Sequence, residues 1–311
     1  MNQEKKISII CHSIALAIVV GLMIFLCFKN SDGIYYDLAI DHAIGDATSW
    51  FGRLFMVVGE YPQYLLIPIS GTIMFYNADT LNDKTKTVIF RIFACIVIAA
   101  GLFIWVNNGT KIDNMKLPAS TAFAIFTVIF YGPVFLGIGY LVPKETMHRL
   151  FKAAIFLLTF VIVSYLVMTI MKEFWSRMRY RDMLKEGSFD GFTPWFKLNF
   201  GRENKVEGYE YTSFPSGHTS SAACIFAICI LPDLFKNLDK KWIRYSLYGF
   251  ATLFTVIVAI SRLVNTAHFL SDVLIGGSVT YGIFYLLKYL FFKNGYEFKN
   301  KEIITDEVTQ E

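Results

Sequence analysis

The stretch that decides the fold is Ala153–Met171, with the sequence AAIFLLTFVIVSYLVMTIM, followed at once by Lys172. It holds no charged residue, and as a helix it is long enough to cross roughly 30 Å of hydrocarbon. Working outward from it, the sequence predicts an all-α fold, a polytopic transmembrane helical bundle of about eight spans. The other seven segments are Ile7–Phe28, Val57–Tyr76, Thr87–Val106, Ala119–Val142, Thr219–Leu231, Ile243–Ser261 and Val273–Phe292.

The composition supports a membrane protein. Of the 311 residues, 55% are hydrophobic and only 17% are charged, whereas soluble domains average about 45–50% and about 25%. This excludes a disordered chain. It also excludes a disulfide scaffold, because the five cysteines all lie in apolar runs. A net charge of +4 gives no case for a nucleic-acid partner.

The distribution of Lys and Arg predicts the orientation. With eight spans, the basic N-terminus, the basic tail and three basic connections near residues 84–91, 144–152 and 236–244 fall on one side, which is expected to be cytoplasmic. The opposite side receives residues 29–56, 107–118, 172–218 and 261–272. The segment 172–218 is itself rich in Lys and Arg, against this rule, but the other loops outweigh it. We expect the first segment to be an anchored span, because it is longer than the usual signal-peptide core.

The chain divides into three parts on this reading. Residues 1–150 are N-terminal transmembrane helices without a motif, residues 151–292 are a catalytic transmembrane core with the outer loop 172–218, and residues 293–311 are a cytoplasmic polar tail. Between the first two spans, Ile40, Ile44, Ala47 and Phe51 recur at helical spacing with the aspartates off that stripe. This pattern predicts either a short amphipathic helix at the outer interface or a plain solvated loop.

Three polar clusters interrupt this apolar background, and all three fall on the outer side. Polar groups at membrane boundaries are costly to bury and are therefore candidates for function. The clusters are Lys172–Arg181 (KEFWSRMRYR), Phe214–Ser221 (FPSGHTSS), and Ser261–Arg262 with His268 and Asp272.

Together these residue types suit metal-free phosphate chemistry. Lys172, Arg179 and Arg262 are cations that bind phosphate, and Pro215–Ser216–Gly217 opens a helix whose amides favour an anion. A carboxylate at Asp272 would fix the tautomer of His268 and leave its other nitrogen as a nucleophile. His218 would protonate the leaving oxygen in a transfer through phosphohistidine. Each motif alone also has a structural reading, as a helix cap, a snorkelling arginine or an i,i+4 hydrogen bond. Their agreement in order and side favours the functional one.

The three clusters resemble the signature of the type-2 phosphatidic acid phosphatase superfamily, which includes integral-membrane lipid phosphate phosphatases. Its pattern is Lys-x6-Arg-Pro, Pro-Ser-Gly-His and Ser-Arg-x5-His-x3-Asp, and it occurs here with one departure, Tyr180 in place of proline. The resemblance implies a six-helix phosphatase core and a reaction without metal or cofactor. The roles it implies are phosphate binding by Lys172, Arg179, Ser216, Gly217 and Arg262, general acid for His218, nucleophile for His268, and nucleophile partner for Asp272.

Two further arginines flank these cations. We expect Arg177 and Arg181 to face solvent or lipid headgroups, and as a hypothesis they help to bind the second phosphate of a pyrophosphate. His12, His42 and His148 have no spaced partner, so no metal site is expected.

The leading functional prediction is an integral-membrane phosphatase whose partners are the lipid bilayer and a lipid phosphate substrate. Undecaprenyl pyrophosphate, phosphatidylglycerol phosphate and phosphatidic acid all fit, and recycling of an isoprenoid carrier is preferred because the site faces outward. The expected location is a plasma membrane, bacterial in type, with the active site on the extracytoplasmic side. A lipid-linked phosphotransferase using the same site is the alternative enzyme, and an anion transporter or lipid scramblase is the non-enzymatic one.

Overall fold

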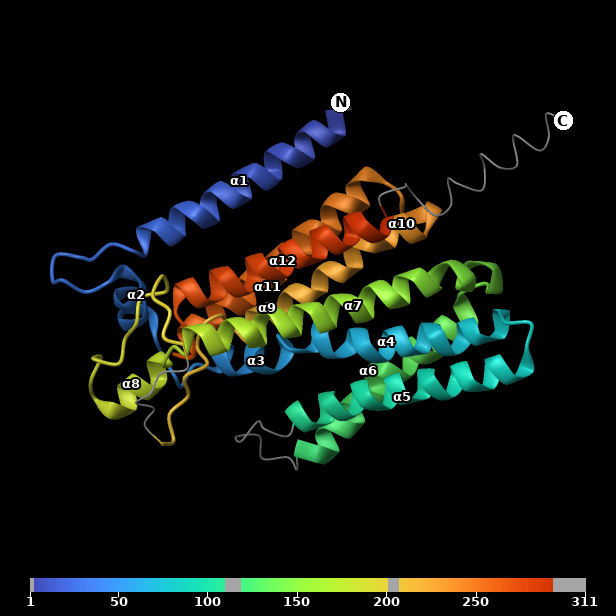
Figure 1. The fold of residues 1–311 in the computed structure, drawn as a ribbon, viewed down its shortest axis with the longest axis horizontal. Coiled ribbons are helices and arrows are strands. Elements are labelled where there is room, and N and C mark those ends of the chain that lie inside the picture. Colours follow the sequence, from blue (N-terminus) through green and yellow to red (C-terminus); the bar gives the residue numbers. More distant parts are fainter. Residues whose placement is uncertain (1–2, 110–118, 201–206, 293–311) are drawn as a thin grey trace. The chain divides into compact units, whose positions relative to one another are not determined.

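Helices make up most of the part of the protein that its computed structural model describes, which is residues 3–109, 119–200 and 207–292 (Figure 1). No strand occurs in these ranges, where Lys29 and Tyr35 form an isolated bridge. The α-helices are α1 (Gln3–Phe25), α2 (Tyr36–Ile44), α3 (Trp50–Val58), α4 (Tyr61–Asn77), α5 (Lys84–Gly109), α6 (Ala119–Leu141), α7 (Lys144–Trp175), α8 (Tyr180–Glu186), α9 (Gly217–Ala223), α10 (Leu231–Leu234), α11 (Lys241–Val264) and α12 (Leu270–Phe292). Three short 3₁₀ helices are η1 (Ala78–Thr80), η2 (Cys224–Ile230) and η3 (Lys236–Leu238).

Five helical segments in the described ranges are long and apolar enough to cross a membrane. They are Lys84–Trp105, Leu150–Glu186, Gly217–Leu234, Lys241–Val264 and Leu270–Phe292. Each overlaps a span expected from the sequence, and the chain therefore has the character of an integral membrane protein. Two of the other expected spans contain shorter apolar helices, Ile10–Phe25 and Tyr131–Leu141, and the third is α4, with 17 residues. The full count of eight stays a prediction. The tail 293–311 lies outside the described residues.

The chain forms two compact units, each built from separate stretches of sequence. The first unit comprises Met1–Met56, Leu166–Ser220 and Val256–Val279. The second comprises Val57–Tyr165, Ser221–Thr255 and Thr280–Glu311.

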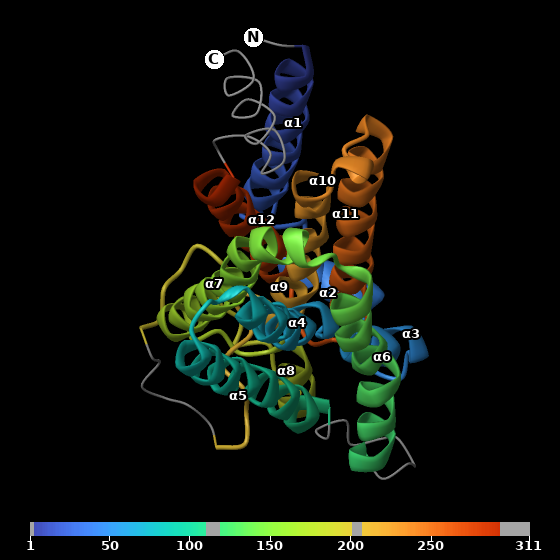
Figure 2. The ribbon, with the colours of Figure 1, turned by 90° about the vertical axis from the view of Figure 1, so that its right-hand side faces the viewer.

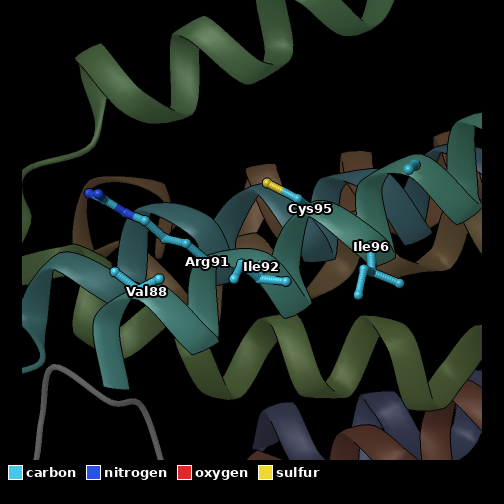
Figure 3. A pocket seen from close by; sticks show the side chains of 6 residues that line it. Val88, Arg91, Ile92, Cys95 and Ile96 are labelled. Atoms are coloured by element: carbon cyan, nitrogen blue, oxygen red, sulfur yellow. The ribbon is translucent and has the colours of Figure 1, made fainter. Parts of the chain in front are cut away.

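The second unit consists of helices that pack side by side. Helices α4 and α5 lie side by side in both views of the ribbon (Figures 1 and 2). Polar side chains add bonds between helices, as is usual where apolar helices pack together. Ser70 Oγ donates to the Ala154 carbonyl at 2.6 Å, and Asn77 Nδ2 donates to the Met147 carbonyl at 2.7 Å, so both tie α4 to α7. A shallow groove of about 480 Å³ follows one face of α5 (Figure 3), and none of the predicted site residues lines it.

The first unit contains the segments 29–56, 172–218 and 261–272 and a small core of its own. Leu38, Met178, Tyr180, Met183, Tyr211 and Phe269 form this core. The amphipathic helix expected between the first two spans is wrong in its detail. Two helices, α2 and α3, replace it, and they are separated where Gly45 takes an extended backbone conformation. Ile44 of the expected apolar stripe is 42% exposed, while Asp37 and Asp41, which lie off that stripe, are buried. A buried arginine, described below, accounts for Asp37.

Candidate active site

All eight residues predicted to carry the chemistry lie in the first unit. Lys172 is in the last turn of α7, and Arg179 is the N-cap of α8. Tyr180, which replaces the expected proline, therefore takes the first helical position, where proline is favoured. Its ring is buried, and its hydroxyl lies 3.0 Å from His42 Nδ1. Helix α8 thus starts at Tyr180 without a proline.

The Pro-Ser-Gly-His segment opens α9. The Ser216 hydroxyl accepts hydrogen bonds from the amide and hydroxyl of Thr219, at 3.3 and 3.1 Å, as an N-cap serine does. The Ser216 amide donates to the Asp272 carbonyl at 3.0 Å, so α9 is joined to the start of α12. The two backbones touch at Gly276, where a Cβ would lie 2.5 Å from the Ser216 carbonyl oxygen. Only glycine fits there without displacement.

His268 is held through one ring nitrogen. Its Nδ1 lies 2.8 Å from the carbonyl oxygen of Ser213 and 3.5 Å from Asp272 Oδ2. Both neighbours are acceptors, so Nδ1 carries the proton and Nε2 keeps its lone pair. Asp272 Oδ2 is itself fixed by the Ser213 hydroxyl and by the amide of Phe269, the latter at 3.0 Å.

The surroundings of His268 keep its imidazole neutral. The side chain is 1% exposed, and burial lowers its pKa to about 4, against the opposing effect of Asp272 and with help from the positive charges of Arg179 and Lys172. A neutral imidazole with a free Nε2 is the form that can attack phosphorus.

The second histidine lies close to the first. The ring centroids of His218 and His268 are 6.3 Å apart. The charges of Arg262, Arg179 and Lys172 all act on His218. The structure thus brings both histidines and three cations into one cluster, in which His268 and Arg262 are buried.

The three predicted phosphate-binding cations have different neighbours. Lys172 Nζ would lie 3.1 Å from a Cβ on Gly217, so the ammonium reaches the first residue of α9. Arg262 is buried and donates to the Gly52 carbonyl of α3. Arg179 pairs with Glu210, with 2.9 Å between Nη1 and Oε2, and the other oxygen of Glu210 pairs with Arg181 at 2.8 Å. A carboxylate therefore holds the guanidinium on which phosphate was expected.

The expectation for Arg177 is wrong. Its side chain is 1% exposed and does not face solvent or headgroups. It forms ion pairs with Asp37 at 2.9 Å and with Asp272 at 2.7 Å. Two buried carboxylates draw this arginine inward, and so it is not placed to bind a second phosphate. Arg181, with 31% of its side chain exposed, remains partly accessible.

Three residues at the site were not predicted from the sequence: Ser213, Glu210 and Asp37. Ser213 lies five residues before His218, so its place next to the motif was a usable signal. Glu210 lies in the same loop without a recognisable spacing, and Asp37 is 140 residues from its partner Arg177. In the described ranges, no three His, Cys, Asp or Glu side chains are grouped so as to hold a metal ion.

Comparison with known proteins agrees with the motifs. Residues 153–296 match the model of the PAP2 superfamily. The predicted resemblance to this superfamily is confirmed over these residues. No significant match to a solved structure was found.

Two curated relatives are bacterial enzymes. Lipid A 1-phosphatase of Porphyromonas gingivalis is 35% identical over 105 residues, which is 34% of this chain and 22% of that protein. Phosphatidylglycerophosphatase B of Bacillus subtilis is 39% identical over 82 residues, which is 24% of this chain and 37% of that protein. The chain thus aligns with less than two fifths of either relative.

Proposed function

We propose that the protein is an integral-membrane phosphatase that hydrolyses the phosphate of a lipid. The observation that carries the proposal is the arrangement of His268, with Nδ1 held by Ser213 and Asp272, its pKa lowered to about 4, and the ring of His218 at 6.3 Å. The match of residues 153–296 and two relatives named as phosphatases of lipids support it.

The proposed reaction has two steps. His268 Nε2 attacks phosphorus, the bond from phosphorus to the lipid oxygen breaks, and His218 gives its proton to that oxygen. Water then attacks the phosphohistidine with His218 accepting its proton, the N–P bond breaks, and orthophosphate leaves. Lys172, Arg179 and Arg262, with Ser216 and Gly217 at the start of α9, are proposed to bind the phosphoryl oxygens. No step requires a metal ion.

The proposed substrate is a lipid carrying a terminal phosphate or diphosphate. Phosphatidylglycerol phosphate, undecaprenyl pyrophosphate and phosphatidic acid are the candidates. The site is proposed to face the extracytoplasmic side of a bacterial plasma membrane, within a core formed by residues 151–292. Such a position allows an acyl or prenyl tail to stay in the bilayer while the headgroup reaches the cations.

Phosphate release from these three lipids by purified protein in detergent, with a chelator present, tests the proposal. The wild type is expected to release phosphate, and a His268→Ala variant is expected to lose the activity by at least about 10³-fold. Acid-quenched protein should carry labelled phosphate on His268. Full phosphate release by the His268→Ala protein would refute the phosphatase mechanism, and failure of the wild type on the whole panel, with transport of the anion instead, would favour a transporter.

A further inference from the structure

The buried Arg177 joins the catalytic carboxylate to a second one from outside the matched segment. Its Nη1 donates to Asp272 Oδ1 and to the Ser271 hydroxyl, both at 2.7 Å, and its Nη2 donates to Asp37 Oδ2 at 2.9 Å. Asp37 Oδ1 accepts from the Ser271 amide at 3.0 Å. Asp37 thus binds the residue before Asp272 as well as the arginine that binds Asp272.

Arg177 reaches the catalytic pair by its backbone too. Its carbonyl oxygen accepts from the amide of Ser213 at 3.0 Å. Ser213 in turn accepts from His268 through its carbonyl oxygen and donates to Asp272 through its hydroxyl. The guanidinium lies 4.0 Å from the ring centre of Phe269, so its position is fixed by packing as well as by charge.

The charges of this cluster do not cancel. Arg177 brings one positive charge, and Asp37 and Asp272 bring one negative charge each. For Asp41, one turn after Asp37 on α2, burial and the nearby Asp37 and Asp272 raise the pKa well above the ordinary value, against the opposing effect of Arg177. The cluster therefore keeps an excess negative charge beside His268, whose ring becomes positive as Nε2 bonds to phosphorus.

We propose that Asp37 and Arg177 are positioning residues that orient Asp272 and, through it and Ser213, His268 for attack. On this inference, which rests on the proposed phosphatase function, helix α2 is part of the catalytic apparatus although it precedes the segment that matches the family. Neither side chain is proposed to bind substrate, because both terminal nitrogens of Arg177 and both carboxylate oxygens of Asp37 already bond within the protein.

The Asp37→Asn variant tests this role most directly. The amide keeps an oxygen for Arg177 and the shape of the side chain but removes the charge. We expect kcat to fall by at least about tenfold, as for other groups that orient a catalytic ligand, while KM stays within about twofold of the wild type. Asp32→Asn is the matched control, because Asp32 is an exposed carboxylate five residues away that contacts Asn30; it should behave as wild type.

The pH profile separates positioning from a merely structural defect. The groups acting on His268 are Asp272, Arg179 and Lys172, with His218 beside it and the pair Arg177 and Asp37 behind Asp272. Because Asp37→Asn removes a negative charge, the acid limb of kcat/KM should move to lower pH. A protein that is only partly folded would lose activity equally at every pH.

The outcomes decide between the proposals. If wild type and His268→Ala differ as expected but folded Asp37→Asn has wild-type kcat, the positioning role is wrong and the phosphatase proposal stands. Should Asp37→Asn fail to fold, Ser271→Ala replaces it, since it removes only the hydroxyl linking Arg177 to Asp37. A kcat lowered about threefold with unchanged KM supports the inference, and an unchanged kcat overturns it. Inactivity of the wild type itself refutes the proposed function.

Discussion

Glu210 forms an ion pair with the guanidinium of Arg179, and removing the charge of Glu210 should tighten substrate binding. In the free protein one oxygen of Glu210 pairs with Arg179 and the other with Arg181. A substrate phosphate that binds Arg179 must displace the first of these contacts. The Glu210→Gln variant removes the competing charge. The backbone of Glu210 is held independently, by its carbonyl to the Arg179 amide and by its amide to Asp182, so the loop keeps its place.

The size of the effect follows from exposure. The Glu210 side chain is 49% exposed and that of Arg179 is 12% exposed, and such partly solvated pairs are worth about 0–1 kcal/mol. Since 1.4 kcal/mol is a factor of ten, KM should fall by up to about fivefold. The value of kcat should not change, because Glu210 has left Arg179 before the chemical step.

The assay is phosphate release from a lipid phosphate in mixed micelles, with orthophosphate as a competing inhibitor. The inhibition constant of orthophosphate should fall by the same factor as KM, and at about 1 M salt the ratio of variant to wild type should approach one because exposed charges are then screened. Glu207→Gln, at an exposed glutamate of the same loop, is the control. A KM that is unchanged or raised in Glu210→Gln would refute the competition and indicate that Glu210 helps to orient Arg179 instead.

Three further predictions follow from the site. Because the pKa of buried His268 is lowered to about 4, kcat/KM should hold on the acid side until the imidazole protonates near pH 4, and a rate that halves near pH 6.5 would contradict this. Between about pH 4 and 6.5 the stability of the fold should rise with pH, because the unfolded chain binds more protons there than the folded one. Gly276→Ala places a Cβ 2.5 Å from the Ser216 carbonyl oxygen and should lower the free energy of unfolding in detergent by about 1–3 kcal/mol. Gly282→Ala on the same helix, with no neighbour within 4 Å, should be neutral or stabilising. Equal stabilities of the two variants would count against the close contact at Gly276. The double variant Asp37→Asn/Glu210→Gln should combine the kcat of the first with the KM of the second, and a strong departure from the product would mean that the two carboxylates are coupled.

Local pattern was sufficient for much of the fold and for the motif residues. Long uncharged runs such as Ala153–Met171 identify helices because lipid leaves few other structures for the backbone. The spacing of Lys172, Arg179, His218, His268 and Asp272 placed these residues in one site, and the structure brings them together in the first unit. Whether they perform the assigned chemical roles stays a prediction.

The incorrect predictions concern residues whose position depends on a partner that is distant in the sequence. An arginine beyond a span usually extends to the interface, and Arg177 does not, because it finds Asp37 across 140 residues of sequence. The stripe from Ile40 to Phe51 suggested one amphipathic helix at the membrane interface, but the structure has two helices there and buries Asp37 and Asp41. No periodicity reports such a pairing, since the energy of a buried ion pair depends on a partner that only the fold supplies.

Because Arg177 and Arg179 differ in burial, the two arginines have different roles. They are two positions apart, and each is paired with carboxylates. The pairs of Arg177 are inaccessible to water, so breaking one would leave an uncompensated charge in an apolar setting, and the arginine is fixed for as long as the fold persists. The ion pair of Arg179 is solvated on the side of Glu210. Water and salt therefore lower the free-energy cost of replacing that carboxylate by a phosphate. The carboxylates around the first arginine should therefore govern the rate of the chemical step, and the carboxylate on the second should govern affinity for the anion.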